Sequence, residues 1–256
     1  MKRTLAEIGT SFDTDKTHSP GYIENYERHL EHLRDQPVRL LELGVYHGGS
    51  LLMWNEYFHQ GRIVGVDRSP NPLKTLPDRV RFYQGSQDDP ELLERVAAEN
   101  ARQGFDIIID DAAHIGTVAR TSFCTLFDRH MRSGGIYVVE DWGTGYWNTW
   151  PDGALYQQAQ SNRRPAHSRA GILSALVRGK LSSWLGWPAT ASDTPRVDPD
   201  FSSHNFGMVG FVKELVDQVA WSDVIRAGHG NSRIGGAAPA IRQLTAYHGQ
   251  VFLIKA

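Results

Sequence analysis

Residues 38–50 read VRLLELGVYHGGS, and this stretch decides the fold. Its first part, Val38–Val45, is an apolar run of the length expected for a buried strand. The glycines that follow let the backbone turn sharply and approach a ligand closely. The next residues, Ser50–Phe58, have the pattern of a helix. A strand that passes through a glycine-rich turn into a helix is typical of the nucleotide-binding unit of α/β proteins.

Outward from this turn, short apolar runs and helical stretches alternate up to about residue 140. The further expected strands are Arg62–Val66, Val80–Tyr83, Phe105–Ile109 and Ile136–Val139, and the expected helices are Pro90–Asn100 and Arg120–Met131. Such alternation favours a parallel sheet covered on both faces. Gly207–Val212 and Val251–Ile254 are expected to add two more strands. The sequence therefore predicts an α/β fold with a mostly parallel, seven-stranded sheet and helices on both faces.

The length of 256 residues is ordinary for a single α/β domain with insertions, so residues 1–256 are expected to form one domain. Two regions interrupt the rhythm of strands and helices. Residues 1–30 form an N-terminal extension, and residues 142–205 form a long insertion after the fifth strand. Within the insertion, Ala170–Leu185 has the pattern of an amphipathic helix. A loop of this length is typically a lid, a binding element or a disordered segment, and we expect this one to recognise the substrate.

The composition excludes several classes of protein. The net charge of −2 argues against a basic face for nucleic acid. Cys124 is the only cysteine, so no intrachain disulfide can form, which suits a reducing, cytoplasmic location. The N-terminal residues lack the apolar segment of a signal peptide, and no apolar run is long enough to span a membrane. We therefore expect no nucleic acid and no membrane among the partners.

The turn itself points to one kind of cofactor. A dinucleotide site usually has the pattern G-x-G-x-x-G, whereas this turn reads E-x-G-x-x-x-G-G-S from Glu42 through Gly44 and Gly48 to Ser50. A carboxylate is unfavourable beside a pyrophosphate, but it suits the sulfonium and ammonium of S-adenosylmethionine. Asp67 ends the next strand, 25 positions after Glu42, where an acid can bind both ribose hydroxyls. The alternative is a tight structural turn of the kind that any α/β protein can contain.

The loop after the third strand, Gln84–Asp88, lies where such folds place the adenine. Ser86 and Gln87 can hydrogen-bond the edge of that ring. The alternative for each residue is a place in a solvated loop before the helix that starts at Pro90.

Acidic residues follow two of the expected strands. Asp110 and Asp111 end the fourth strand, and Glu140 and Asp141 end the fifth. The ends of parallel strands share one edge of the sheet, and carboxylates held close together repel unless a proton or a cation lies between them. A hard dication such as Mg²⁺ is the simplest solution, with Asp111, Glu140 and Asp141 as ligands. Asp110 is expected to point away from the metal, toward the cofactor, and the alternative for the set is solvated acids at strand ends.

His114 follows Asp111 by three residues, near the start of a helix. Neutral imidazole predominates near pH 7, so His114 can act as a general base on a hydroxyl whose pKa is lowered by the dication. A structural histidine is the alternative.

Together these motifs resemble metal-dependent, class I S-adenosylmethionine sugar O-methyltransferases of the mycinamicin type, from macrolide antibiotic biosynthesis. The matching stretches are DTDK (13–16), YIENY (22–26), LLELGVYHGGSLLMW (40–54), GVD (65–67), IIIDDAAH (107–114) and GGIYVVEDWGTGYW (134–147). The family carries Gly-Ser where this chain has Ala112-Ala113. His204–Lys213 looks like the sixth strand of that family. The resemblance implies a Rossmann-like methyltransferase fold, Asp111, Glu140 and Asp141 as metal ligands, and catalysis by His114 with Asp111.

The resemblance also implies that the DTDK segment and the nearby tyrosines close over the cofactor. The complete set of expected cofactor-binding residues is Asp15, Lys16, Tyr22, Tyr26, Glu42, Gly44, Tyr46, Gly48, Ser50, Asp67, Ser86, Gln87 and Asp110. Trp142, Tyr146, Trp147 and Trp150 follow the metal ligands, and such aromatic faces bind sugar rings well. A packed core within the insertion is the alternative for these aromatic residues.

The leading hypothesis is an S-adenosylmethionine- and Mg²⁺-dependent O-methyltransferase that acts on a hydroxyl of a sugar or glycoside, in a natural product or a polysaccharide. One alternative is a metal-dependent methyltransferase of catechols or other small phenols, which tends to use a lysine base. A nucleotide-binding module without catalysis is a second alternative, and a dehydrogenase, which the turn disfavours, is a third. A homo-oligomer is compatible with the sequence, which specifies neither the oligomeric state nor the acceptor.

Overall fold

The computed structural model describes residues 2–163, 203–224 and 241–256. The expected amphipathic helix Ala170–Leu185 and most of the insertion that contains it lie outside the described residues.

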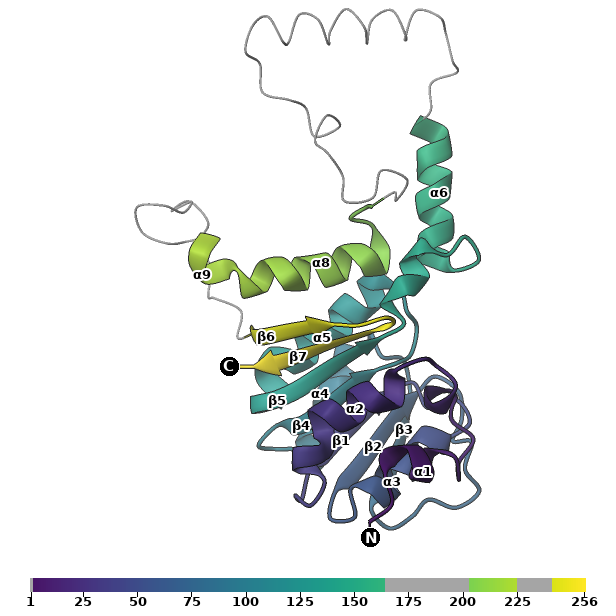
Figure 1. Ribbon diagram of the computed structural model, residues 1–256, viewed down its shortest axis with the longest axis vertical. Helices are drawn as coiled ribbons and strands as arrows, with labels where there is room; N and C mark the ends of the chain where they lie inside the picture. The colour runs from purple at the N-terminus through teal and green to yellow at the C-terminus, as the bar shows by residue number, and fades with distance from the viewer. Residues whose placement is uncertain (1, 164–202, 225–240) are drawn as a thin grey trace, which may run out of the picture.

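Within the described residues, seven strands form one sheet in the order β3-β2-β1-β4-β5-β7-β6 (Figure 1). The strands are β1 (Arg39–Leu43), β2 (Arg62–Asp67), β3 (Val80–Gln84), β4 (Phe105–Asp110), β5 (Met131–Glu140), β6 (Ile241–Ala246) and β7 (Gln250–Lys255). The first five strands in that spatial order pair in parallel, whereas β7 runs antiparallel to both β5 and β6. The predicted mostly parallel, seven-stranded sheet is confirmed.

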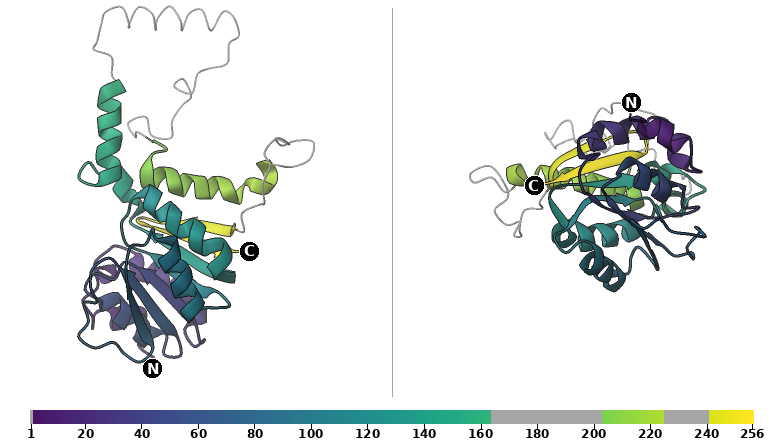
Figure 2. Two further views of the ribbon diagram at one scale, coloured as in Figure 1. Left: turned by 180° about the vertical axis from the view of Figure 1, so that it is seen from behind. Right: turned by 90° about the horizontal axis from the view of Figure 1, so that it is seen from below.

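Helices cover both faces of the sheet (Figures 1 and 2). One face is covered by α1 (Leu5–Gly9), α2 (Tyr22–Leu30) and α3 (Gly49–Tyr57), and the other by α4 (Pro90–Asn100), α5 (Gly116–His130) and α8 (Gly207–Val219). The remaining described elements are the 3₁₀ turns η1 (Asp15–Thr17), η2 (Glu31–Leu33) and η3 (Trp142–Tyr146), together with α6 (Pro151–Arg163) and α9 (Trp221–Val224).

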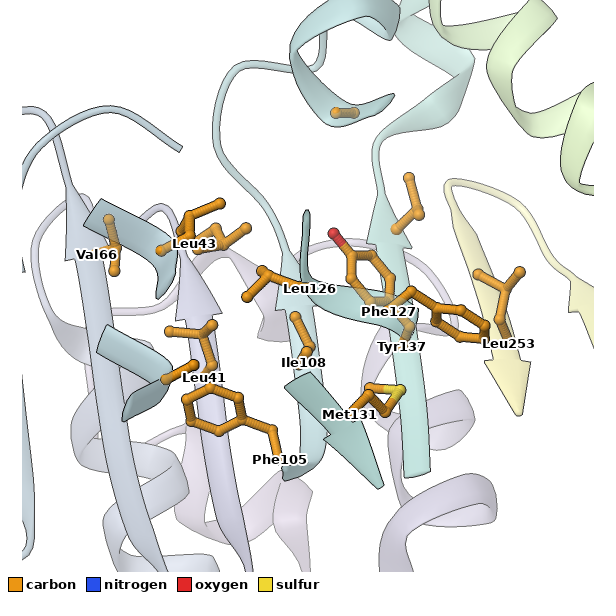
Figure 3. Packing of buried hydrophobic residues seen from close by; sticks show 14 of the residues in the cluster. Leu41, Leu43, Val66, Phe105, Ile108, Leu126, Phe127, Met131, Tyr137 and Leu253 are labelled. Carbon is orange, nitrogen blue, oxygen red and sulfur yellow. The ribbon is translucent and has the colours of Figure 1, made fainter. Parts of the chain in front are cut away.

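The central strands are apolar on both sides, which explains why they read as unbroken hydrophobic runs. Neighbouring residues of a strand point to opposite faces, so Leu40 packs in the core under α1–α3 while Leu41 packs in the core under α4, α5 and α8. Figure 3 shows Leu41 and Ile108 of the sheet beside Leu126 and Phe127 of α5 in the second of these cores.

The prediction of a strand at Gly207–Val212 is wrong, because this stretch is the first half of α8. The apolar residues continue at Leu215, Val216 and Val219, and the complete pattern has the spacing of a helix. The assignment of His204–Lys213 as the sixth strand is therefore also wrong. The missing strand is β6, IRQLTA, which lies at the edge of the sheet with only Ile241 buried.

A single buried carboxylate joins two helices that are distant in sequence. Asp152, in the first turn of α6, accepts hydrogen bonds from the backbone N–H of Gly116 at 2.8 Å and of Met208 at 2.7 Å through the same oxygen, Oδ2. Gly116 begins α5 and Gly207 begins α8, so Asp152 satisfies N–H groups that have no partner within their own helices.

The strand order reverses between β1 and β4, because β2 and β3 extend the sheet on one side of β1 whereas β4 and β5 extend it on the other. In open α/β sheets, ligands bind at such a switch point, outside the carboxyl ends of the strands. None of the helices in the described parts of the chain has the length and apolar composition needed to cross a membrane.

Candidate functional site

A cavity of about 930 Å³ lies at the carboxyl ends of β1, β2, β3 and β4. Nine of the residues expected to bind the cofactor, bind the metal or take the substrate proton line its wall around the glycine turn and the strand ends. They are Asp15, Gly44, Tyr46, Ser50, Asp67, Ser86, Gln87, Asp111 and His114. The structure does not bring the other expected cofactor residues to this wall, namely Lys16, Tyr22, Tyr26, Glu42, Gly48 and Asp110.

Asp67 holds the glycine turn in shape. Its Oδ2 accepts hydrogen bonds from the backbone N–H of Val45 at 2.8 Å and of Tyr46 at 3.1 Å, and its Oδ1 accepts one from Ser69 N–H at 2.7 Å. Burial alone raises the pKa of Asp67, but these N–H donors outweigh it and lower the pKa below its ordinary value. Asp67 therefore presents an ionised carboxylate to the cavity.

Gly44 allows the ends of β1 and β4 to meet. Its φ of +91° lies in the left-handed region, and a Cβ at this position would lie 2.0 Å from the carbonyl oxygen of Asp111. A glycine is needed here for both reasons, and the close approach brings the glycine turn beside the acidic strand end.

Glu42 lies behind the turn and is fully buried. Its carboxylate accepts hydrogen bonds from Ser50 Oγ at 2.8 Å and Trp54 Nε1 at 3.2 Å. Lys16 Nζ lies 3.5 Å from its Oε1. Burial raises the pKa of Glu42, against the opposing attraction of Lys16.

Gln87 and Asp110 join the loops that follow β3 and β4. Gln87 Nε2 donates to Asp110 Oδ1 at 2.8 Å and to Ser122 Oγ at 2.9 Å, while its Oε1 accepts from Ala113 N–H at 2.7 Å. Burial raises the pKa of Asp110 to about 7. Both amide hydrogens of Gln87 thus have partners within the protein, and Ser86 Oγ donates to Asp88.

The predicted acidic cluster exists, and the ammonium of Lys16 lies inside it. Lys16 Nζ donates to Asp111 Oδ2 at 2.5 Å and to Glu140 Oε2 at 3.0 Å. Burial lowers the pKa of Lys16, but attraction from Asp111, Glu140 and Glu42 exceeds that effect and raises the pKa well above its ordinary value. Burial and repulsion by Glu140 nevertheless raise the pKa of Asp111, because one ammonium does not compensate this many carboxylates.

Two tyrosines of α2 also donate to these acids. Tyr22 OH donates to Asp141 Oδ1, and Tyr26 OH donates to Glu140 Oε1. Both oxygens of the buried Glu140 therefore have donors from the N-terminal residues. The structure places Tyr22 and Tyr26 against the acids rather than over the cavity.

Asp111, His114 and Asp141 form a group that can hold a metal ion. One ligand atom from each lies within 4.8 Å of the others. His114 Nε2 is 3.6 Å from Asp141 Oδ2 and 3.9 Å from Asp111 Oδ1. Burial lowers the pKa of His114, and Asp141 and Glu140 oppose that effect. The expected ligand set had Glu140 in the place that His114 takes in this group.

Trp142 and Tyr146 lie within η3 and Trp147 follows it, and these expected substrate aromatics are not part of the cavity wall. Trp142 Nε1 donates to the carbonyl oxygen of Tyr247 at 3.1 Å, and its ring packs against the core. The ring of Tyr146 contacts those of Trp142 and His204, with centroids 6.3 and 4.9 Å away. Trp147 is 56% exposed.

Three further residues lie near the site: Trp150, one of the aromatic residues expected to bind a sugar ring, Asp13 of the DTDK segment, and His18, which was not expected there. Trp150 has its ring centroid 5.8 Å from that of His114, and its buried Nε1 has no hydrogen-bond partner within the described residues. Asp13 and His18 line the cavity beside Asp15. Asp13 belongs to the DTDK motif and His18 follows that motif by two residues, whereas the position of Trp150 depends on how η3 leads into α6.

No protein-family model matches the chain. Among curated proteins, the chain is 44% identical over 159 residues to 8-demethyl-8-(2-methoxy-alpha-L-rhamnosyl)-tetracenomycin-C 3'-O-methyltransferase of Streptomyces olivaceus, covering 59% of this chain and 38% of that protein. It is 42% identical over 159 residues to mycinamicin VI 2''-O-methyltransferase of Micromonospora griseorubida, covering 57% of this chain and 38% of that protein. The curated homologues are sugar O-methyltransferases, and the chain spans less than half the length of these two.

A solved structure of the MycE methyltransferase from the mycinamycin biosynthetic pathway, in complex with Mg, SAH and mycinamycin VI, has a similar fold. It superposes with a TM-score of 0.67 at 29% identity, over 100% of this chain and 55% of that one. A second MycE structure, with Mg and SAH, gives a TM-score of 0.66 at 29% identity and the same coverage. The fold is that of a Rossmann-like methyltransferase, as predicted.

Proposed function

We propose that this chain carries the catalytic site of an S-adenosylmethionine- and Mg²⁺-dependent O-methyltransferase that methylates a hydroxyl of a sugar or glycoside. The observation that carries the proposal is one cavity whose wall runs from the ionised Asp67 to Asp111 and His114. The names of the curated homologues, which are O-methyltransferases of glycosylated natural products, support the same class of acceptor.

The cavity suits a nucleoside cofactor with a cationic end. Asp67 can accept hydrogen bonds from the two ribose hydroxyls, as an acid at the end of this strand does in related folds. Gly44 leaves the backbone open to close approach by the cofactor. Asp15 and Asp111 supply negative charge at the cavity wall, which favours a sulfonium and an ammonium.

The residues also fit a divalent cation. Asp111 Oδ1 and Asp141 Oδ2 would hold the cation beside His114, whose Nε2 stays uncoordinated and available as the base, and the surrounding carboxylates exceed the single ammonium of Lys16. Oxygen-rich, negatively charged sites of this kind are typical of Mg²⁺. A bound dication would supply Lewis-acid chemistry that lowers the pKa of a coordinated hydroxyl.

His114 is the group proposed to remove the hydroxyl proton. Its burial favours the neutral imidazole, which is the form a general base needs. The neighbouring carboxylates of Asp141 and Asp111 then stabilise the imidazolium that forms at Nε2. The indole N–H of Trp150, which has no partner among the described residues and lies beside the His114 ring, can donate to an oxygen of the acceptor.

The test is methyl transfer from labelled S-adenosylmethionine to a panel of rhamnosides, other deoxysugar glycosides and catechols. We expect glycoside methylation that EDTA abolishes and that Asp111→Asn lowers by at least about a hundredfold, because both the metal and the base lose a partner. Asp128→Asn, on the exposed side of α5, is the matched control and should keep full activity.

Full activity in EDTA would contradict the metal-dependent mechanism. Methylation of catechols but not of glycosides would show that the acceptor is a phenol and would contradict the proposed sugar acceptor.

A further inference from the structure

The acid cluster already contains a cation that belongs to the chain. Lys16 lies in η1, 95 residues before Asp111 and 124 before Glu140, and its side chain is 1% exposed. Its ammonium contacts Asp111, Glu140 and Glu42, at 2.5, 3.0 and 3.5 Å. A buried ammonium with three carboxylate neighbours is costly to desolvate unless it compensates their charge. The ammonium is thus an integral part of the cluster.

Lys16 and the candidate metal group use different oxygens of Asp111. Lys16 Nζ binds Oδ2, whereas Oδ1 lies on the side of His114 Nε2. The two oxygens of Asp141 also have different partners: Oδ1 accepts a hydrogen bond from Tyr22 OH, and Oδ2 faces His114 Nε2. Lys16 and Tyr22 therefore bind one oxygen of each carboxylate, and the other oxygen of each faces His114. The ammonium and a dication can thus be bound at the same time.

We propose that Lys16 is a built-in counter-cation, a positioning residue that stabilises the acid cluster without metal and thereby keeps the affinity for a divalent cation moderate. The inference rests on the metal site of the proposed function. The metal-free chain folds because Lys16 offsets the repulsion among Asp111, Glu140 and Glu42. When a dication binds, the same positive charge lies within a few ångströms and opposes it.

Lys16→Met removes the charge and keeps most of the length of the side chain. At pH 8.5, we expect the variant to melt at a clearly lower temperature than wild type in EDTA. We also expect Mg²⁺ to raise its Tm by at least twice the wild-type increment. By calorimetry, its Kd for Mg²⁺ should be at least about tenfold lower than that of wild type. Lys2→Met is the matched control, because Lys2 pairs with Asp35 on the exposed surface, and it should change neither quantity.

The outcomes separate the inference from the proposed function. If Mg²⁺ raises Tm equally and binds with equal Kd in wild type and Lys16→Met, the proposed role of Lys16 as a counter-cation is wrong. Absence of Mg²⁺ binding in wild type and Lys16→Met would overturn the metal site itself.

A variant that folds only with Mg²⁺ supports the inference. If Lys16→Met does not fold in either condition, Lys16→Met/Glu42→Gln removes one charge of each sign and should fold with a strong Mg²⁺ response. Failure of this double variant with Mg²⁺ present, or a wild-type response in it, would overturn the inference.

Discussion

Three non-glycine residues in the described part of the chain have positive φ, namely Tyr46, His114 and Asp141, at +47°, +49° and +52°. Each such residue costs free energy, and the surrounding structure must hold it in place. Tyr46 and His114 line the cavity, and Asp141 lies beside His114. The conformations of His114 and Asp141 turn both side chains toward the proposed metal site, which supports a functional origin for the strain.

Both the stability of the fold and the shape of the candidate site depend on the absence of a Cβ at Gly44. Gly44→Ala should lower the free energy of unfolding by more than about 2 kcal/mol, because alanine is strained at positive φ and its Cβ would meet the Asp111 carbonyl. It should also abolish binding of S-adenosylmethionine. Urea unfolding and calorimetry measure the two effects.

Gly143→Ala is the control for this substitution, since nothing lies within 4 Å of the added Cβ. Its stability should stay within about 0.5 kcal/mol of wild type. Equal effects of the two substitutions would show that the close approach at Gly44 has no special cost.

Among the elements, α6 is coupled to the cofactor-binding half of the fold through Asp152. Asp152 Oδ2 accepts backbone hydrogen bonds from the first turns of both α5 and α8. Because α5 follows directly on the loop that carries His114, this carboxylate also supports the placement of the proposed base.

Asp152→Ala should destabilise the fold by about 2 kcal/mol, since it removes two helix-capping hydrogen bonds of about 1 kcal/mol each. Asp152→Asn retains an oxygen acceptor and should lose less. Urea unfolding at constant pH measures both. Asp217→Ala, on the exposed face of α8, should be neutral, and an equally small loss in Asp152→Ala would contradict the capping role.

The elements differ in how well the sequence predicted them. Helix α4 was predicted with its observed bounds, because Asp89 and Pro90 mark its start and its apolar residues have helical spacing. GMVGFV was misassigned because a six-residue apolar run is compatible with strand and helix, and only the residues after it distinguish the two. Strand β6 was missed because an edge strand buries few side chains.

For the whole molecule, ligand binding and folding are linked. S-adenosylmethionine at a hundred times its Kd should stabilise the chain by about 2.7 kcal/mol, which raises Tm by about 5–10 °C for this size. Asp67→Asn keeps an oxygen for the turn N–H groups but loses the charge, so it should lose most of this increment. Differential scanning fluorimetry measures it.

NADH at the same concentration should leave Tm unchanged. A larger increase in Tm with NADH than with S-adenosylmethionine would contradict S-adenosylmethionine as the cofactor.

The sequence by itself determined the parallel part of the sheet and the edge at which the candidate site lies. Strands buried on both faces need continuous apolar runs, and the carboxyl ends of parallel strands share one edge, so the acids after β4 and β5 had to come together. The tertiary structure alone decided which charges pair. Lys16 reaches Asp111 and Glu140 across 95 and 124 residues, and Glu42 faces the interior instead of the cavity. Such pairings depend on how helices pack over the sheet and on the free energy of burying charge, and neither leaves a periodic signal in the chain.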